Sequence, residues 1–125
     1  MAAITEDYVS FETAKLLKDK GFNEPTIGIY YKDGTFEYFS LNKWNSKFII
    51  PISAPTLQMA MKWLREVHHI YIDLSPTYSE IEKTIHFIWQ IFDSNYDGVG
   101  DCEIFYDKYE TACEEAIKYC LENLI

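Results

Sequence analysis

The chain contains few of the residues that mark disordered or covalently cross-linked proteins. Among its 125 residues there are 5 Gly, 4 Pro and 3 Cys. The scarcity of Gly and Pro argues against intrinsic disorder. An odd number of Cys without a CxxC spacing is typical of reduced thiols rather than of a disulfide framework. The sequence therefore predicts a single folded domain, residues 1–125, whose core needs neither a disulfide nor a metal ion.

Long hydrophobic runs and targeting segments are also missing. The longest apolar stretches are far too short to span a bilayer. The opening residues, MAAITED, have neither the basic region nor the apolar region of a signal peptide. We therefore expect a soluble, cytoplasmic protein without a membrane partner.

Basic residues are scarce, and this scarcity bears on the choice of partner. The chain has 11 Lys and Arg against 20 Asp and Glu, a formal net charge of -9. The whole excess lies in residues 67–125, which carry 3 Lys and 12 acidic residues. Such a surface repels phosphate backbones, so a nucleic-acid partner is disfavoured, whereas cations or a basic protein would be attracted.

Motifs for catalysis or cofactor binding are absent as well. The sequence has no P-loop and no GxGxxG, GxSxG or HExxH pattern. Its histidines, His68, His69 and His86, do not have the spacing of a zinc site. We therefore predict no catalytic residue, no cofactor and no metal ligand from these motifs.

The first half of the chain contains a helix and a hairpin signal. Ser10 is a suitable N-cap for a helix over residues 11–20, and Gly21 can end that helix. Residues 26–40 read as a β-hairpin around Asp33-Gly34, a strong two-residue turn signal. That turn would place Tyr31 opposite Phe36 and Ile29 opposite Tyr38 on a shared face. A short third strand over residues 47–52 is expected at an edge, because Pro51 has no N–H to donate.

Hydrophobic spacing in the second half predicts two helices around a meander of strands. The first helix opens at Ser53 and ends near His69. Strands are expected over residues 70–74, 84–92 and 102–106, with 84–92 in the centre and covered on both faces. Asp107-Lys108-Tyr109-Glu110 has the pattern of a capping box that opens the last helix, which ends near Asn123.

These elements together predict an α+β fold. We expect a mainly antiparallel sheet of five to six strands with three helices packed on it, because strands mostly follow strands along the chain. The first helix with its hairpin, and the second helix with its strands, resemble variants of one unit. An α-β-β pseudo-repeat is therefore an additional hypothesis.

One acidic segment has half of a calcium-binding pattern. Oxygen-bearing side chains at Asp93, Asn95 and Asp97, followed by Gly98, match the start of an EF-hand loop. The twelfth position of such a loop requires a Glu, and this chain has Ile104 there. An ordinary acidic turn between strands explains the same residues and is favoured. Calcium binding through the loop 93–103 is kept as an alternative.

Three large side chains are candidates for a protein interface. Trp44 falls in an expected loop, and Met59 and Trp63 extend the apolar arc of the helix after Ser53 beyond its main stripe. The favoured interpretation of that arc is a wide core face. A contact surface for another chain, which could be a second copy in a homodimer, is the alternative.

Three stretches carry a resemblance to a known group of proteins: YVSFETAKLLKDKGF, SAPTLQMAMKWLREVHHI and YETACEEAIKYCLENLI. They resemble small proteins of unassigned function encoded by phages, prophages and mobile elements of gut Bacteroidetes. The resemblance covers about half of the chain and leaves residues 71–108 as its variable part. It implies a cytoplasmic host setting and an accessory role, and it carries over no functional residue.

The sequence as a whole favours a non-enzymatic accessory protein that acts by protein–protein interaction. The one-sided acidic charge, the many aromatic residues and the missing catalytic motifs motivate this expectation. Two alternatives stay open. One is a calcium-responsive module, and the other is a small enzyme with a carboxylate pair in a cleft.

Overall fold

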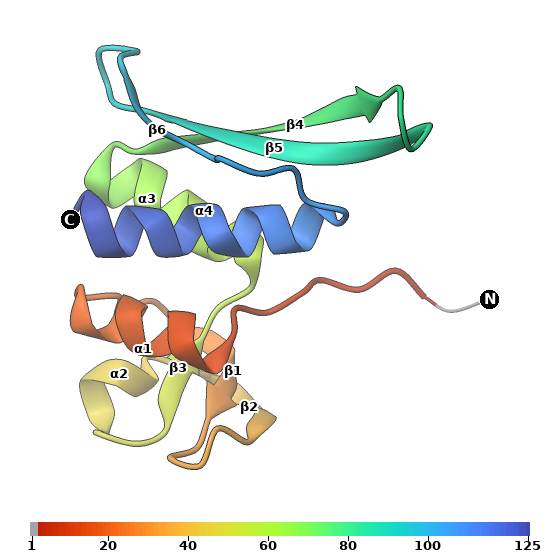
Figure 1. Ribbon diagram of the computed structural model, residues 1–125. Helices are drawn as coiled ribbons and strands as arrows, with labels where there is room; N and C mark the ends of the chain where they lie inside the picture. Colours follow the sequence, from red (N-terminus) through yellow and green to blue (C-terminus); the bar gives the residue numbers. More distant parts are fainter. Residues whose placement is uncertain (1–2) are drawn as a thin grey trace. The chain divides into compact units, whose positions relative to one another are not determined.

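The computed structural model describes residues 3–125 and confirms the α+β fold. The described residues form four helices and two antiparallel three-stranded sheets (Figure 1). In order, the elements are α1 (Phe11–Asp19), β1 (Thr26–Tyr30), β2 (Phe36–Asn42), α2 (Trp44–Lys47), β3 (Ile52–Ala54), α3 (Leu57–His68), β4 (Tyr71–Ser79), β5 (Thr84–Phe92), β6 (Gly98–Asp101) and α4 (Tyr109–Asn123).

The chain forms two compact units, each with its own sheet. Unit 1 runs up to Ala60 and unit 2 from Met61 to Ile125, so the boundary falls inside α3. The single domain expected from composition stays a prediction. None of the helices within residues 3–125 combines the length and the apolar character needed to cross a membrane.

Unit 1 is built on a sheet with the strand order β2-β1-β3. Helices α1 and α2 both contact β3, whose three residues are buried. Ser10 is the N-cap of α1, since its side chain accepts a hydrogen bond from the backbone N–H of Thr13. The strand predicted over residues 47–52 was wrong in its bounds, because β3 begins only after Pro51, whereas its position at the sheet edge is confirmed.

The hairpin of β1 and β2 forms as predicted, but its register differs by one residue. The sequence suggested Tyr31 opposite Phe36, whereas the structure places Tyr30 opposite Phe36. Because side chains alternate between the two faces of a strand, Tyr30 and not Tyr31 shares a face with Phe36. The ring centroids of Tyr30 and Phe36 lie 5.3 Å apart, and those of Phe36 and Tyr38 lie 5.1 Å apart.

The loop of the hairpin explains the slip. Residues 32–34 form a three-residue loop in place of the expected two-residue turn. The backbone N–H of Tyr31 donates to the carbonyl of Thr35, and the N–H of Gly34 donates to the carbonyl of Tyr31. Gly34 has a φ of 86°, the left-handed conformation that closes a three-residue hairpin loop.

Gly28 allows β1 to lie between its two neighbouring strands. A Cβ atom at this position would lie 2.7 Å from the backbone carbonyl oxygen of Ala54 and 3.0 Å from ring atoms of Tyr8 and Phe36. No side chain fits at such distances without a shift of backbone or rings. The close approach of β1 to β3 therefore requires glycine here.

The start of α3 differs from the prediction. Ser53, expected as the N-cap, lies in β3 with a buried side chain. Thr56 takes the capping role, because its hydroxyl oxygen accepts a hydrogen bond from the backbone N–H of Met59 at 3.1 Å. Because Ser53 belongs to β3, the helix begins only at Leu57.

Unit 2 is built on a sheet with the strand order β4-β5-β6. β5 is the central strand, as the sequence indicated, and α4 packs along the sheet against β5 and β4 (Figure 1). Coverage of β5 on both faces was wrong in part, because Ile85 and Gln90 are exposed. The predicted inward face of α4 is confirmed, and its members are all fully buried: Ala112, Cys113, Ala116, Cys120 and Leu121.

The segment before α4 is not the strand that the sequence suggested. The third strand of unit 2 is β6, and residues 102–106 keep only one isolated bridge, between Tyr106 and Phe87. The predicted capping box does not form either. Lys108 is the N-cap residue of α4 and its side chain makes no capping hydrogen bond. The Asp107 carboxylate instead faces a histidine of β5.

The thiols of unit 2 differ in burial, and none is in a disulfide within residues 3–125. Cys113 and Cys120 are fully buried in α4, and burial raises the pKa of each thiol to about 12. Cys102 is half-buried and its Sγ accepts a hydrogen bond from the backbone N–H of Trp89.

The two units repeat the element order α-β-β, but the order of the strands within their sheets differs. The first strand after α1 is the central strand of unit 1, whereas the second strand after α3 is the central strand of unit 2. This difference limits the α-β-β pseudo-repeat to the order of the elements.

Replacing Gly28 by Ala tests the close approach of β1 and β3. We expect Gly28→Ala to lower the free energy of unfolding by about 1–3 kcal/mol, because the added methyl group overpacks a filled site. Gly98→Ala is the matched control, since a Cβ atom there meets nothing within 4 Å. Urea denaturation followed by circular dichroism measures both variants. Equal losses for the two variants would show that the steric argument is wrong.

Candidate functional site

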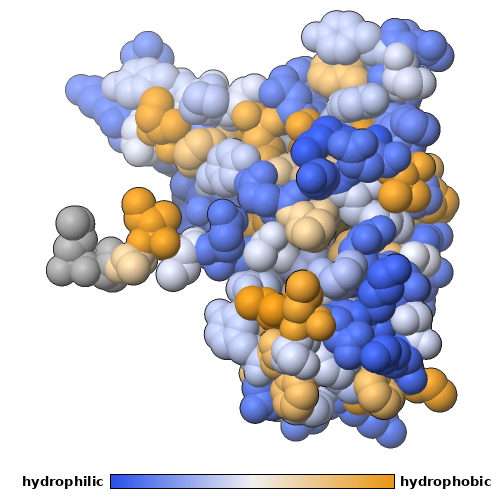
Figure 2. All heavy atoms as spheres, turned by 180° about the vertical axis from the view of Figure 1, so that it is seen from behind, coloured by the Kyte–Doolittle hydropathy of each residue, from blue (hydrophilic) through white to orange (hydrophobic). Residues whose placement is uncertain are grey.

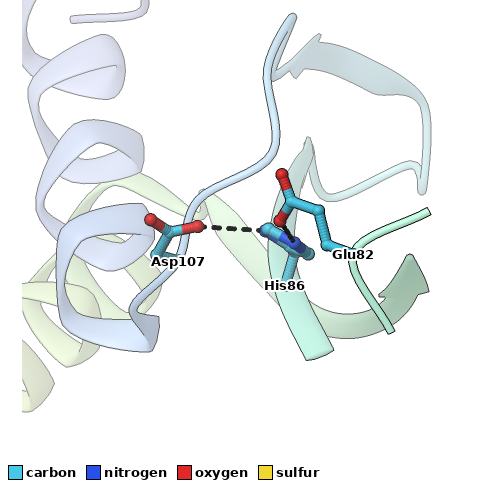
Figure 3. Close-up of side chains that lie close together, drawn as sticks. All are labelled: Glu82, His86 and Asp107. Carbon is cyan, nitrogen blue, oxygen red and sulfur yellow. Dashed lines mark ion pairs between the residues drawn. The ribbon is translucent and has the colours of Figure 1, made fainter. Parts of the chain in front are cut away.

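Three ionisable side chains meet at one end of unit 2. His86 of β5 lies between the carboxylates of Glu82 and Asp107 (Figure 3). One ligand atom from each residue lies within 4.8 Å of the others, so the three could hold a metal ion. We call Glu82, His86 and Asp107 the His86 cluster.

Local backbone hydrogen bonds position Glu82. This residue lies in the turn between β4 and β5, where the hydroxyl of Ser79 accepts a hydrogen bond from the N–H of Glu82 at 3.1 Å. Lys83 completes the turn with a φ of 55° and donates its N–H to the carbonyl of Ser79. The turn places Glu82 four residues before His86 and on the same side of the hairpin.

The bridge between Phe87 and Tyr106 positions Asp107. The N–H of Phe87 donates to the carbonyl of Tyr106 at 2.8 Å, and the N–H of Tyr106 donates to the carbonyl of Phe87 at 2.9 Å. This reciprocal pair holds the segment before α4 against β5. As a result, Asp107 lies beside His86, although 20 residues separate them in the sequence.

The geometry of the His86 cluster is asymmetric. Nε2 of His86 lies 2.7 Å from Oε2 of Glu82, whereas Nδ1 lies 3.2 Å from Oδ1 of Asp107. Nδ1 is buried and makes no hydrogen bond with any described residue, so the contact with Asp107 is one of proximity and charge. The side chain of His86 is 9% exposed, against 61% for Glu82 and 88% for Asp107.

The sequence contained no usable signal for this cluster. His86 read as an ordinary histidine on a strand, and Asp107 as part of a capping box. The relevant spacing depends on the turn after β4 and on the Phe87–Tyr106 bridge, neither of which has a sequence motif. A four-residue step from an acidic residue to a histidine is common and does not indicate a site.

The acidic segment after β5 forms a turn between two strands. Oδ1 of Asp93 accepts hydrogen bonds from the backbone N–H groups of Asn95 at 2.9 Å and Asp97 at 3.0 Å. The N–H of Asp93 also donates to the carbonyl of Asp97. Strands precede and follow the turn, so the helix–loop–helix setting of an EF-hand is not formed here. Calcium binding by this loop stays an untested prediction.

A hollow of about 440 Å³ lies next to that turn. It contains two carboxylates, those of Asp73 and Asp93, together with aromatic side chains. The rings of Phe92 and Tyr96 stack there with centroids 4.7 Å apart. The remaining lining residues are Tyr71, Ile72 and Ser94. The arrangement offers negative charge beside exposed ring faces, which suits a cationic ligand.

Hydrophobic side chains are exposed on the edge of the unit 1 sheet. Between its end residues, β2 is exposed throughout, and Tyr38, Phe39 and Leu41 are 63%, 54% and 67% exposed. The register shifts between Thr26 and Gly28, so that three residues of β2 lie opposite Ile27 of β1. Figure 2 shows apolar side chains at the molecular surface among hydrophilic ones.

Leu41 also borders a mostly apolar hollow of about 270 Å³ in unit 1. Its lining includes Ile27, Met59 and Tyr8, and the ring of Tyr8 lies 5.6 Å from that of Tyr38. We call the residues Tyr8, Ile27, Tyr38, Leu41 and Met59 the β2 surface.

The proposed interface residues have different environments. Met59 is 39% exposed and belongs to the β2 surface. Trp44 was expected at an exposed position, and this was wrong: it is 6% exposed, and its Nε1 donates to the carbonyl of Thr26. Trp63 is also buried, with its ring 4.7 Å from that of His68, as the wide core face predicted. Contact of these three side chains with a partner stays a prediction.

The chain matches no protein-family model, no curated protein and no solved structure. Function is therefore inferred from the geometry of these surfaces.

His68 predicts how stability changes with pH. Burial, helped by the charge of His69, lowers the pKa of His68 below its ordinary value of 6.5. Its Nε2 is buried and forms no hydrogen bond with a described residue. The unfolded chain therefore binds a proton at a higher pH than the folded chain does. This difference reduces stability as the pH falls through 6.5 toward the lowered pKa.

We expect His68→Phe to remove part of this pH dependence. The variant keeps a ring beside Trp63 but cannot bind a proton. Free energies of unfolding measured by urea denaturation between about pH 7.5 and about pH 5.5 should fall less for the variant than for the wild type. Identical pH profiles of the two proteins would show that the lowered pKa of His68 does not contribute to the pH dependence of stability.

Proposed function

We propose that the protein is a non-enzymatic accessory protein that binds another protein through the β2 surface. The observation that carries this proposal is an edge strand whose side chains are exposed on both faces and include large apolar groups. Folded proteins ordinarily protect such edges with charges, proline or a covering element, because an unpaired edge readily pairs with another chain. The cytoplasmic setting and the phage or mobile-element origin expected from the sequence belong to the same proposal.

The expected partner is an extended apolar segment of another protein. Such a segment would add to the free edge of β2 through backbone hydrogen bonds, the mode known as β-augmentation. Its side chains would pack against Tyr38 and Leu41, and one could enter the hollow beside Met59. Lys and Arg balance Asp and Glu in residues 1–66, so apolar contacts, more than charge, would dominate this interface.

The binding proposal is tested by affinity capture from Bacteroidetes lysate with quantitative mass spectrometry. We expect Tyr38→Lys and Leu41→Lys to reduce capture of the specific partner at least about tenfold, because a charge in an apolar contact typically costs more than 1 kcal/mol. Ile81→Lys is the control, since Ile81 is 95% exposed in the turn after β4 and does not belong to the β2 surface.

Two outcomes would contradict the proposal. One is equal capture of the same partner by all four proteins. The other is no specific partner together with a monomer in light scattering. A wild-type dimer that Leu41→Lys converts to a monomer would identify the partner as a second copy of the chain.

The hollow of unit 2 favours a second candidate function, the binding of a small cationic molecule. Asp73 and Asp93 supply negative charge there, while Tyr71 and the Phe92–Tyr96 stack supply ring faces that attract cations. Asp93 accepts two backbone hydrogen bonds in its turn, whereas Asp73 accepts one, from the hydroxyl of Ser75 at 3.3 Å, so Asp73 is the freer carboxylate. The alternative of a small enzyme with a carboxylate pair in a cleft, which named no residues, stays a prediction.

Choline is a suitable probe of this hollow. We expect saturable changes in the backbone amide resonances of Tyr71 and Tyr96 at millimolar choline, because a quaternary ammonium group combines positive charge with an apolar surface. Asp73→Asn should weaken the response severalfold, and Asp101→Asn on β6 should leave it unchanged. The absence of saturable changes in the wild type would remove this candidate.

A further inference from the structure

We propose that His86 and Asp107 bind a divalent transition-metal ion, with zinc as the expected occupant, and that Glu82 holds the histidine ring in the required orientation. The proposal concerns unit 2 alone and does not depend on the β2 surface. It rests on the distances within the His86 cluster, on the burial of His86 and on the absence of a hydrogen-bond partner for its Nδ1 among the described residues.

The contact with Glu82 has the length of an orienting hydrogen bond. Two ligands of one tetrahedral zinc ion, each bound at about 2.0–2.2 Å, lie roughly 3.3–3.6 Å apart. Nε2 of His86 and Oε2 of Glu82 are only 2.7 Å apart, which is too close for shared ligation but normal for a charge-assisted hydrogen bond. A metal-binding histidine ordinarily donates its other ring N–H to a carboxylate in this way.

The contact with Asp107 has the spacing of two ligands. Nδ1 of His86 lies 3.2 Å from Oδ1 of Asp107, close to the separation of ligands around zinc. The two atoms form no hydrogen bond, so the carboxylate oxygen does not satisfy Nδ1. A zinc ion would lie in line with the lone pair of Nδ1. Because tetrahedral ligands form a wide angle at the ion, the oxygen of Asp107 would then lie to one side of that line, where it cannot form a hydrogen bond with Nδ1.

The ligand types and their exposure favour zinc over calcium or magnesium. A ring nitrogen together with a carboxylate suits transition metals, whereas calcium and magnesium prefer oxygen ligands alone. The side chain of His86 is 9% exposed, while Asp107 is 88% exposed and open to solvent. An ion can therefore reach the ring from the Asp107 side, and water molecules would complete its coordination.

Zinc titration of the full chain, after treatment with a chelator, tests the proposal. Isothermal titration calorimetry should show one zinc ion bound per chain, and the melting temperature should rise with zinc concentration, because an ion that binds the folded state stabilises it. Asp107→Asn should weaken binding at least tenfold. Asp101→Asn removes the same charge from exposed Asp101 on β6 and should bind zinc like the wild type.

Glu82→Gln separates the orienting role from ligation. We expect zinc binding about 10–100-fold weaker in this variant, the usual effect of losing a carboxylate behind a metal-bound histidine. Nitrogen-15 NMR of the His86 ring should show the metal on Nδ1 and a proton on Nε2. The proposal is overturned by equal zinc affinity in Asp107→Asn and the wild type, by metal on Nε2, or by binding that depends on His68 and His69 instead.

Discussion

β5 forms backbone hydrogen bonds along both of its edges, and the arrangement of unit 2 depends on this double pairing. On one side β4 pairs with it over its whole length, and on the other β6 pairs with its last residues. The reciprocal bridge between Phe87 and Tyr106 extends the second pairing to the segment before α4. A buried backbone polar group without a partner is costly, so this segment is held where Asp107 meets His86.

The sequence predicted the elements whose causes are local. The span of β5, the inward face of α4 and the capping of α1 by Ser10 follow from side-chain periodicity and from hydrogen bonds within one turn. The register of the first hairpin did not follow, because the chain closes a three-residue loop at Gly34. The same dipeptide, Asp33-Gly34, is compatible with either loop length.

The candidate site could not be predicted, because its members meet only through tertiary structure. His86 and Asp107 lie in different elements, and a bridge without a motif brings them together. The capping box predicted at Asp107 is a further example of a tertiary contact that the local sequence does not indicate. Local pattern assigned that carboxylate to the helix, whereas the folded chain directs it to a histidine. Likewise, Trp44 looked exposed in a loop until the carbonyl of Thr26 provided a buried partner for its indole.

The unequal burial of the three thiols makes the protein convenient for site-specific labelling. Cys113 and Cys120 are closed off inside α4 and hold their protons tightly, whereas Cys102 lies partly open to solvent. A maleimide dye would therefore attach at one place without any engineered cysteine. Cys102 lies five residues before Asp107 in the sequence. The fluorescence of a dye on Cys102 would therefore report changes near the His86 cluster in an otherwise native chain.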